Sequence, residues 1–241
     1  MPNIGQQVFT RRSLPHWYVP GADYFITFRL DGSLPREALD KLAEQRRNLM
    51  DESPRSDESP RDRSMRIHKL IFAGYDRLLD EQSNDQLLSD PRIAAVVRSS
   101  LYYVHEELKR YHPMSYRIMP NHVHLVFSLS DQSFQPNEVV NPGEQTDSTS
   151  PLSRVMHSIK SFTAHEINKL THSTGPVWQR ESFDHWIRTD EELERIVEYV
   201  RMNPVKARLV QKPEDWYFSS AHDRLLSDGQ RTGWLKWRTK S

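Results

Sequence analysis

Two histidines stand one residue apart in MPNHVHLVFSL, residues 119–129. Alternate side chains of a β-strand point to the same face, so His122 and His124 would share a face that need not be fully buried. Their Cα atoms would lie about 7 Å apart, which lets both imidazoles bind one metal ion. An isolated pair with this spacing is more often two half-exposed strand histidines. The other face carries only apolar residues and should face the core: Val123, Leu125, Phe127 and Leu129.

A predicted helix, residues 189–204, carries two side chains that could complete such a site. Tyr199 and Asn203 are neighbours at positions i and i+4, on the flank of the apolar stripe of this helix. From that flank a phenol and an amide oxygen could reach the sheet and still meet solvent. Without the histidines, an ordinary amphipathic tyrosine and a C-terminal asparagine would be the preferred interpretation. The apolar stripe consists of Leu193, Ile196, Val197 and Val200.

The ends of this helix are marked by local signals. Thr189 and Glu192 have the spacing of a capping box, which predicts the start of the helix. Pro204 is expected to end it directly after Asn203, because proline disfavours helical geometry in the residue before it.

The remaining elements indicate an α+β fold. Strands are expected within residues 17–30, 114–119, 122–129 and 177–188, and helices within residues 35–50 and 151–172. The block that starts near Met65 is expected to hold one or two helices, the clearer over residues 90–111. Strands that alternate with helices, with hairpin spacing around the histidines, predict one antiparallel sheet covered by helices.

Two acidic stretches interrupt this pattern. Residues 51–65 hold five acids and three arginines, and residues 131–150 hold four acids and no base. Both lack periodicity and are expected to be loops or disordered insertions in a single domain that covers residues 1–241, with a C-terminal extension from about residue 212. The stretches carry charges of −2 and −4, so the rest of this neutral chain carries +6. This mild positive charge is only weak support for a polyanionic partner.

The composition excludes several classes of protein. The chain has no cysteine, which excludes disulfides, thiolate metal sites and a cysteine nucleophile. No apolar stretch approaches the roughly 20 residues of a membrane helix, and the N-terminus lacks a secretion signal. We therefore expect a cytoplasmic protein with no membrane partner.

Five blocks occur in an order that resembles the REP-associated tyrosine transposases, a branch of the single-tyrosine HUH transposases. The resemblance implies a ferredoxin-like or RRM-like antiparallel sheet that carries the histidines, with a nucleophilic tyrosine on a later helix. His122 and His124 match the histidine pair, Tyr199 the nucleophile, and Asn203 a third metal ligand; the metal is usually Mg²⁺ or Mn²⁺. The blocks are RRSLPHWYVPGADYFITFRLDGSLP, YRIMPNHVHLVFSL, LSRVMHSIKSFTAHEINK, GPVWQRESFDHWIR and IVEYVRMNPVKARLV.

The resemblance also implies a substrate and a reaction. Such proteins nick and transfer single-stranded DNA at palindromes that fold as hairpins, through a 5′-phosphotyrosine intermediate. A monomer or a homodimer is expected. The main alternative is a non-catalytic protein that binds hairpin DNA or RNA on the same fold. A third possibility, a metallohydrolase that uses a metal-bound water, requires more hard ligands than the sequence suggests.

Eight residues are candidates for DNA contacts because they combine stacking surfaces, hydrogen-bond donors and positive charge. The alternative is that the tryptophans belong to the core and that the basic residues form a solvated surface. The candidates are His16, Trp17, Tyr18, Lys160, Trp178, Gln179, Arg180 and Arg188.

Overall fold

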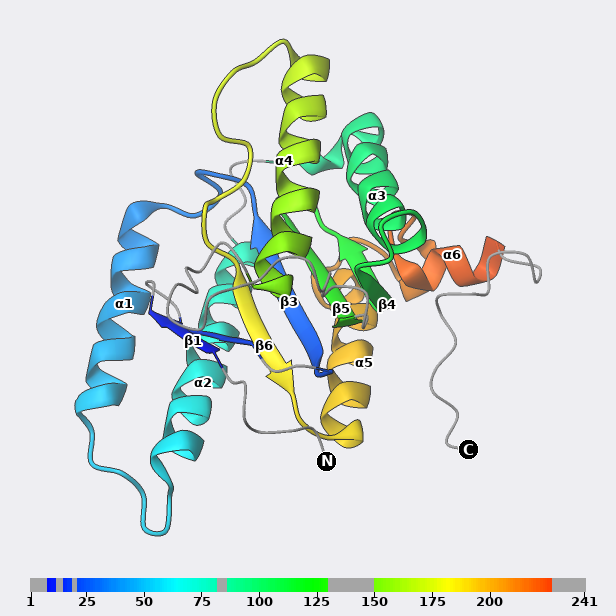
Figure 1. Cartoon of the computed structure of the whole chain (residues 1–241). Helices are drawn as coiled ribbons and strands as arrows, with labels where there is room; N and C mark the ends of the chain where they lie inside the picture. The colour runs from blue at the N-terminus through cyan, green and yellow to red at the C-terminus, as the bar shows by residue number, and fades with distance from the viewer. Residues whose placement is uncertain (1–7, 12–14, 19–20, 82–85, 130–149, 227–241) are drawn as a thin grey trace, which may run out of the picture.

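A computed structural model describes residues 8–11, 15–18, 21–81, 86–129 and 150–226 (Figure 1). Its strands are β1 (Val8–Arg11), β2 (Pro15–Tyr18), β3 (Asp23–Arg29), β4 (Tyr111–Ile118), β5 (His122–Leu129) and β6 (Phe183–Ile187). Its α-helices are α1 (Arg36–Asp51), α2 (Pro60–Glu81), α3 (Pro91–Glu106), α4 (Pro151–Thr171), α5 (Asp190–Lys206) and α6 (Ser220–Leu226). Short 3₁₀ turns span Leu87–Ser89 and Pro213–Asp215. No helix among these residues is long and apolar enough to cross a membrane.

The main sheet has four strands in the order β4-β5-β3-β6, and every neighbouring pair is antiparallel. Helix α3 lies between β3 and β4 in the chain, and α4 lies between β5 and β6. This β-α-β-β-α-β order is that of the ferredoxin-like fold, with α1 and α2 added before α3. The predicted α+β class and the antiparallel sheet covered by helices are confirmed. Strands β1 and β2 form a separate two-stranded sheet.

One face of the main sheet holds the larger hydrophobic core, under α3 and α4 (Figure 1). The sheet contributes the alternate residues that the strand pattern assigned to this side, including Val123, Leu125 and Phe127. Helix α3 begins where Asp90 accepts a hydrogen bond from the Arg92 backbone N–H, with Pro91 in the first turn, as its sequence predicts.

Helices α2 and α5 contribute to a smaller cluster on the opposite face of the sheet. Val197 and Val200 of α5 are buried there, as the apolar stripe predicts, and they pack with Phe25 of β3 and Phe72 of α2. His122 and His124 lie on this face, and both are fully buried. This face is more closed than the strand pattern required, because Asp76 of helix α2 packs against the histidines.

The first acidic stretch differs from its prediction. Residues 52–59 connect α1 to α2, but residues 60–65 form the first turns of α2. Ser59 explains the early start, because its hydroxyl oxygen accepts a hydrogen bond from the Asp62 backbone N–H at 3.1 Å, and Pro60 follows it. Ser59 and Pro60 lie within the acidic stretch, whose composition alone predicted a loop. Of the second stretch, only Ser150 lies within the described residues.

Two other boundaries also differ. The helix expected over 90–111 ends at Glu106, and β4 already begins at Tyr111. Helix α5 continues to Lys206 with Pro204 inside it. The expected stop after Asn203 was wrong, because Pro204 lies in the last turn and the Asn203 carbonyl still accepts from the Ala207 N–H at 2.8 Å.

The described part of the C-terminal extension packs against β4. The Trp216 indole N–H donates to the Ile118 carbonyl at 2.9 Å, and the Tyr116 backbone N–H donates to the Ser220 hydroxyl at 3.2 Å. Residues 212–226 therefore support the strand that lies beside the histidines.

Candidate active site

The imidazoles of His122 and His124 face each other, with their Nε2 atoms 3.1 Å apart. Strand β5 places both on the side covered by α2, one residue apart as the strand period requires. The Nδ1 atom of each ring has a different partner. His122 Nδ1 lies 2.6 Å from Asn121 Oδ1, and His124 Nδ1 lies 2.8 Å from the Thr27 hydroxyl.

These partners determine which nitrogen of His122 is available. The amide of Asn121 donates from Nδ2 to the Leu79 carbonyl at 3.0 Å, which orients Oδ1 as the acceptor for His122 Nδ1–H. His122 Nε2 therefore carries a lone pair. The Thr27 hydroxyl can donate or accept, so it suits either tautomer of His124. Such hydrogen bonds at the far nitrogen are those that orient metal-binding histidines.

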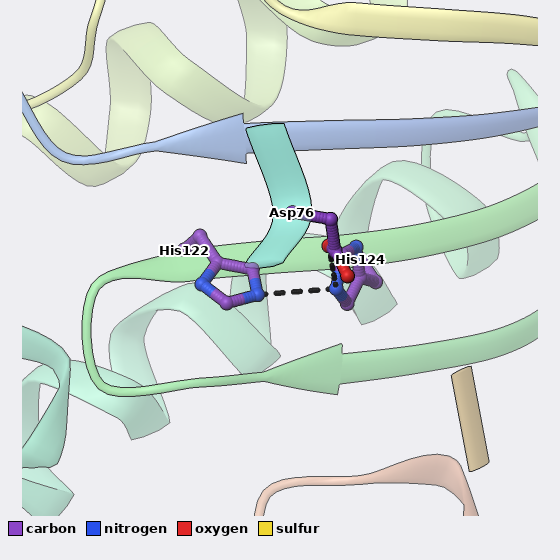
Figure 2. Close-up of side chains that lie close together, drawn as sticks. All are labelled: Asp76, His122 and His124. Carbon is purple, nitrogen blue, oxygen red and sulfur yellow. Dashed lines mark hydrogen bonds and ion pairs between the residues drawn. The ribbon is translucent and has the colours of Figure 1, made fainter. Parts of the chain in front are cut away.

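A carboxylate from α2 completes a three-residue group with the histidines (Figure 2). Asp76 Oδ1 lies 3.4 Å from His124 Nε2, and the possible ligand atoms of Asp76, His122 and His124 all lie within 4.8 Å of one another. Burial raises the pKa of Asp76 to about 6. Burial also lowers the pKa of His122 to about 3 and holds that of His124 well below its ordinary value, so both imidazoles are neutral at neutral pH.

Asp76 was not among the site residues predicted from the sequence. A signal was nevertheless present, since Asp76 stands four residues after Phe72 and three before Leu79, within the apolar side of α2. An acid at such a position is unexpected unless it has a buried partner. The sequence pattern of α2 does not show that this helix packs against the histidines, so it did not identify Asp76 as their partner.

Tyr199 joins this group through the same carboxylate. Its hydroxyl donates a hydrogen bond to Asp76 Oδ2, and its ring lies 5.8 Å from the imidazole of His124 between centroids. The ring is partly exposed, as its place on the helix flank predicts. Burial and then the negative charge of Asp76 raise the pKa of Tyr199 well above its ordinary value, so the phenol is protonated.

Asn203 lies one turn further along α5 and is buried. Its Nδ2 donates to Asp80 Oδ2 at 3.4 Å, while its Oδ1 has no hydrogen-bond partner within the described residues. A buried amide oxygen without a partner is available to a ligand. Its role as the third metal ligand remains a prediction.

The donor set suits a divalent cation. Asp76 Oδ1 is a second buried oxygen that no described residue hydrogen-bonds, and it lies 3.4 Å from His124 Nε2. Imidazole nitrogens suit Zn, Cu, Fe and Ni, whereas carboxylate and amide oxygens suit Mg and Mn. The residues therefore fit a metal ion but do not select which one.

The candidates for DNA contacts are separate from this group. Trp178 is 6% exposed, its ring packs edge-on against Phe28, and its indole N–H donates to the Thr163 hydroxyl at 2.8 Å. The expected stacking surface is wrong for this ring, because the core uses it. Lys160 donates to the Gln179 and Arg180 carbonyls, so it holds this loop against α4.

The other candidates remain predictions. Arg180 and Arg188 are exposed, and Gln179 is half-buried. Arg188 lies 3.8 Å from an Asp62 carboxylate oxygen and 5.4 Å from the ring centre of Trp186. The backbone of His16, Trp17 and Tyr18 forms β2, and their side chains lie outside what the structure describes.

Comparisons with known proteins relate the chain to one group. No family model matches it. It is 28% identical over 118 residues to "Putative REP-associated tyrosine transposase" of Haemophilus influenzae, a match that covers 48% of this chain and 62% of that protein. A solved structure of a REP-associated tyrosine transposase bound to a REP hairpin has the same fold, with a TM-score of 0.50 and 18% identity over 94% of this chain and 92% of the other. In sequence over about half of its length, and in fold over nearly all of it, the protein resembles the REP-associated tyrosine transposases, as its sequence blocks predict.

Proposed function

We propose that this protein nicks single-stranded DNA at hairpin-forming palindromes and transfers the cut strand, with Tyr199 as nucleophile. One observation carries the proposal. A single carboxylate, Asp76, contacts His124 through Oδ1 and accepts the Tyr199 hydroxyl through Oδ2. A candidate metal position and a candidate nucleophile are thereby joined by one side chain. We also expect the protein to act in the cytoplasm, as a monomer or a homodimer.

The reaction follows from the position of the phenol. The Tyr199 oxygen attacks the phosphorus atom and loses its proton, while the bond from phosphorus to the 3′ oxygen breaks and that oxygen gains a proton. The products are a 5′-phosphotyrosine and a free 3′-hydroxyl. Because one phosphodiester replaces another, the 3′-hydroxyl of a second strand can reverse the step without an external energy source.

His122, His124 and Asp76 would hold the divalent cation, with Asn203 as the predicted additional ligand. When bound, the cation supplies positive charge and polarises a phosphate oxygen. The family resemblance favours Mg²⁺ or Mn²⁺. The protein contributes the alignment of Tyr199, since its phenol is held by a hydrogen bond to Asp76 and by its packing beside His124.

A second candidate function is hairpin binding without cleavage. The full burial of both histidines and the raised pKa of Tyr199 favour this alternative, because they describe a protonated phenol beside a covered site. The relative of known structure is bound to a REP hairpin, which agrees with either function. A metallohydrolase that uses a metal-bound water would instead turn over without Tyr199.

The test uses labelled single-stranded hairpins made from inverted repeats that flank the gene, with Mn²⁺ or Mg²⁺. We expect a protein–DNA adduct that survives denaturation, and its loss in Tyr199→Phe. Tyr103→Phe is the matched control, because Tyr103 is an exposed tyrosine on α3. Binding without any adduct would support the non-catalytic alternative, and cleavage that persists in Tyr199→Phe would support the hydrolase.

A further inference from the structure

Arg117 lies on the same face of the sheet as the histidines. Strands β4 and β5 pair Arg117 directly opposite His124, and opposed residues of antiparallel strands point to the same side. The side chain is fully buried. Its Nη2 donates to the backbone carbonyl of Arg201, at the neighbouring turn of α5.

The remaining donors of this guanidinium are unused. Nε and Nη1 of Arg117 are buried and have no hydrogen-bond partner within the described residues. A buried donor without a partner is unfavourable, and more so when it is charged. Burial lowers the pKa of Arg117 to about 9, which leaves the group positively charged at neutral pH. The fold therefore maintains an unsatisfied cation beside the candidate metal position.

The charged groups around Arg117 leave an excess of positive charge. The Tyr199 phenol and the Asp80 carboxylate interact with it electrostatically, and it lowers the pKa of His122 and of His124. A divalent cation would be neutralised by Asp76 and Asp80, both on α2, leaving the positive charge of Arg117 in excess. Exposed Lys206 lies over the outer face of the Tyr199 ring, 5.1 Å from its centre. Arg29 is also buried on this face, so a phosphate, which carries negative charge, would reduce the excess positive charge there.

We propose that Arg117 binds the non-bridging oxygens of the scissile phosphate while Tyr199 attacks it. This inference rests on the proposed function. A phosphodiester carries one negative charge, and the guanidinium fork matches two of its acceptor atoms. Arg29, opposite His122, is satisfied to a greater extent, because its Nη1 is bound to the Leu30 carbonyl and the Ser33 hydroxyl and only its Nε lacks a partner among the described residues.

The experiment combines a substitution in the protein with a change in the substrate. Arg117→Gln and wild type are compared in single-turnover adduct formation with Mn²⁺, on a normal hairpin and on hairpins with a neutral methylphosphonate at the scissile position, one diastereomer at a time. Arg201→Gln is the matched control, because its guanidinium is bound to Glu198 and Glu214 while its backbone carbonyl remains in place. Arg117→Lys keeps the charge but loses the fork.

We expect Arg117→Gln to slow adduct formation on the phosphate by about 10²–10³-fold, the usual effect of removing one donor to a developing oxyanion. On one methylphosphonate diastereomer, the same substitution should slow adduct formation less than about tenfold. The negative charge that Arg117 binds is absent from this substrate. Thermal unfolding of Arg117→Gln without metal should be unchanged or higher, since a buried unsatisfied cation is removed.

If Arg117→Gln slowed adduct formation equally on the phosphate and on both methylphosphonates, the inference would be overturned. An equal decrease of the rate in Arg201→Gln would also overturn it. An adduct rate that Arg117→Gln leaves unchanged would also overturn it, while the proposed function would stand. A wild-type protein that forms no adduct on any hairpin would instead contradict the proposed function itself.

Discussion

The two faces of the central sheet are both buried, but they are built differently. Under α3 and α4, the residues of β5 are apolar and pack into one continuous cluster. Under α2 and α5, the same strand presents His122 and His124, surrounded by oxygen and nitrogen atoms that lack hydrogen-bond partners within the described chain. The first face has an arrangement that maximises stability. The second face is less stable because several of its polar atoms lack partners, and a bound metal ion and a phosphate would supply those partners.

The largest expected effect is a difference in stability between one substitution on each face. Leu125→Ala should lower the free energy of unfolding by about 2–5 kcal/mol, because it opens a cavity in the apolar core. Asn203→Leu, on the other face, should change it by less than about 1 kcal/mol, because removing a buried oxygen without a partner offsets the loss of the long hydrogen bond to Asp80. Urea unfolding measures both, and an equal loss in the two variants would refute the division.

A bound metal should restore stability to the polar face. Mn²⁺ at about 100 times its dissociation constant should raise the free energy of unfolding by about 2.7 kcal/mol, because it binds the folded chain. His122→Ala should abolish this gain, whereas His165→Ala, at an exposed position, should keep it. Thermal unfolding with and without Mn²⁺ provides the measurement. A gain that survives in His122→Ala would place the ion elsewhere.

The pH dependence of the metal-free protein should report Asp76. Burial raises the pKa of Asp76 to about 6, above its value in the unfolded chain. The folded state therefore binds the proton more tightly, and its stability falls as the pH rises from about 4 through about 6. We expect a loss on the order of 2 kcal/mol in wild type relative to Asp76→Asn, measured by urea unfolding in a chelator. Parallel curves for the two proteins would contradict this assignment.

The smallest effect concerns Trp178, which belongs to the apolar face. Trp178→Phe should cost about 1 kcal/mol of stability, because the hydrogen bond to Thr163 is lost, and should leave hairpin affinity unchanged. A role in base stacking would instead weaken DNA binding by about 1–3 kcal/mol. Fluorescence anisotropy with a labelled hairpin distinguishes the two roles.

The apolar face was predictable from the sequence because local periodicity specifies it. The alternation of Val123, Leu125 and Phe127 identified the core side of β5, and the capping signals at Asp90 and Thr189 located two helix starts. The boundary at Pro204 was missed because a proline in the last turn removes only its own N–H, which leaves the neighbouring hydrogen bonds in place.

The polar face was predictable only in part. His122, His124 and Tyr199 stood out by residue type and spacing, and the structure brings them around one carboxylate. Asp76 and Arg117 did not stand out, because their roles depend on how α2 packs and on the register of β4 against β5. Contacts between distant segments are set by tertiary packing, which local patterns do not encode.

The most direct test is to identify the residue that carries DNA after reaction. A hairpin incubated with the wild-type protein and Mn²⁺, then digested with nuclease and protease, is analysed by tandem mass spectrometry. The account predicts a nucleotide linked through its 5′ phosphate to the tyrosine of the peptide that contains Tyr199. A linkage to any other residue, or cleaved DNA with no linked peptide, would contradict it.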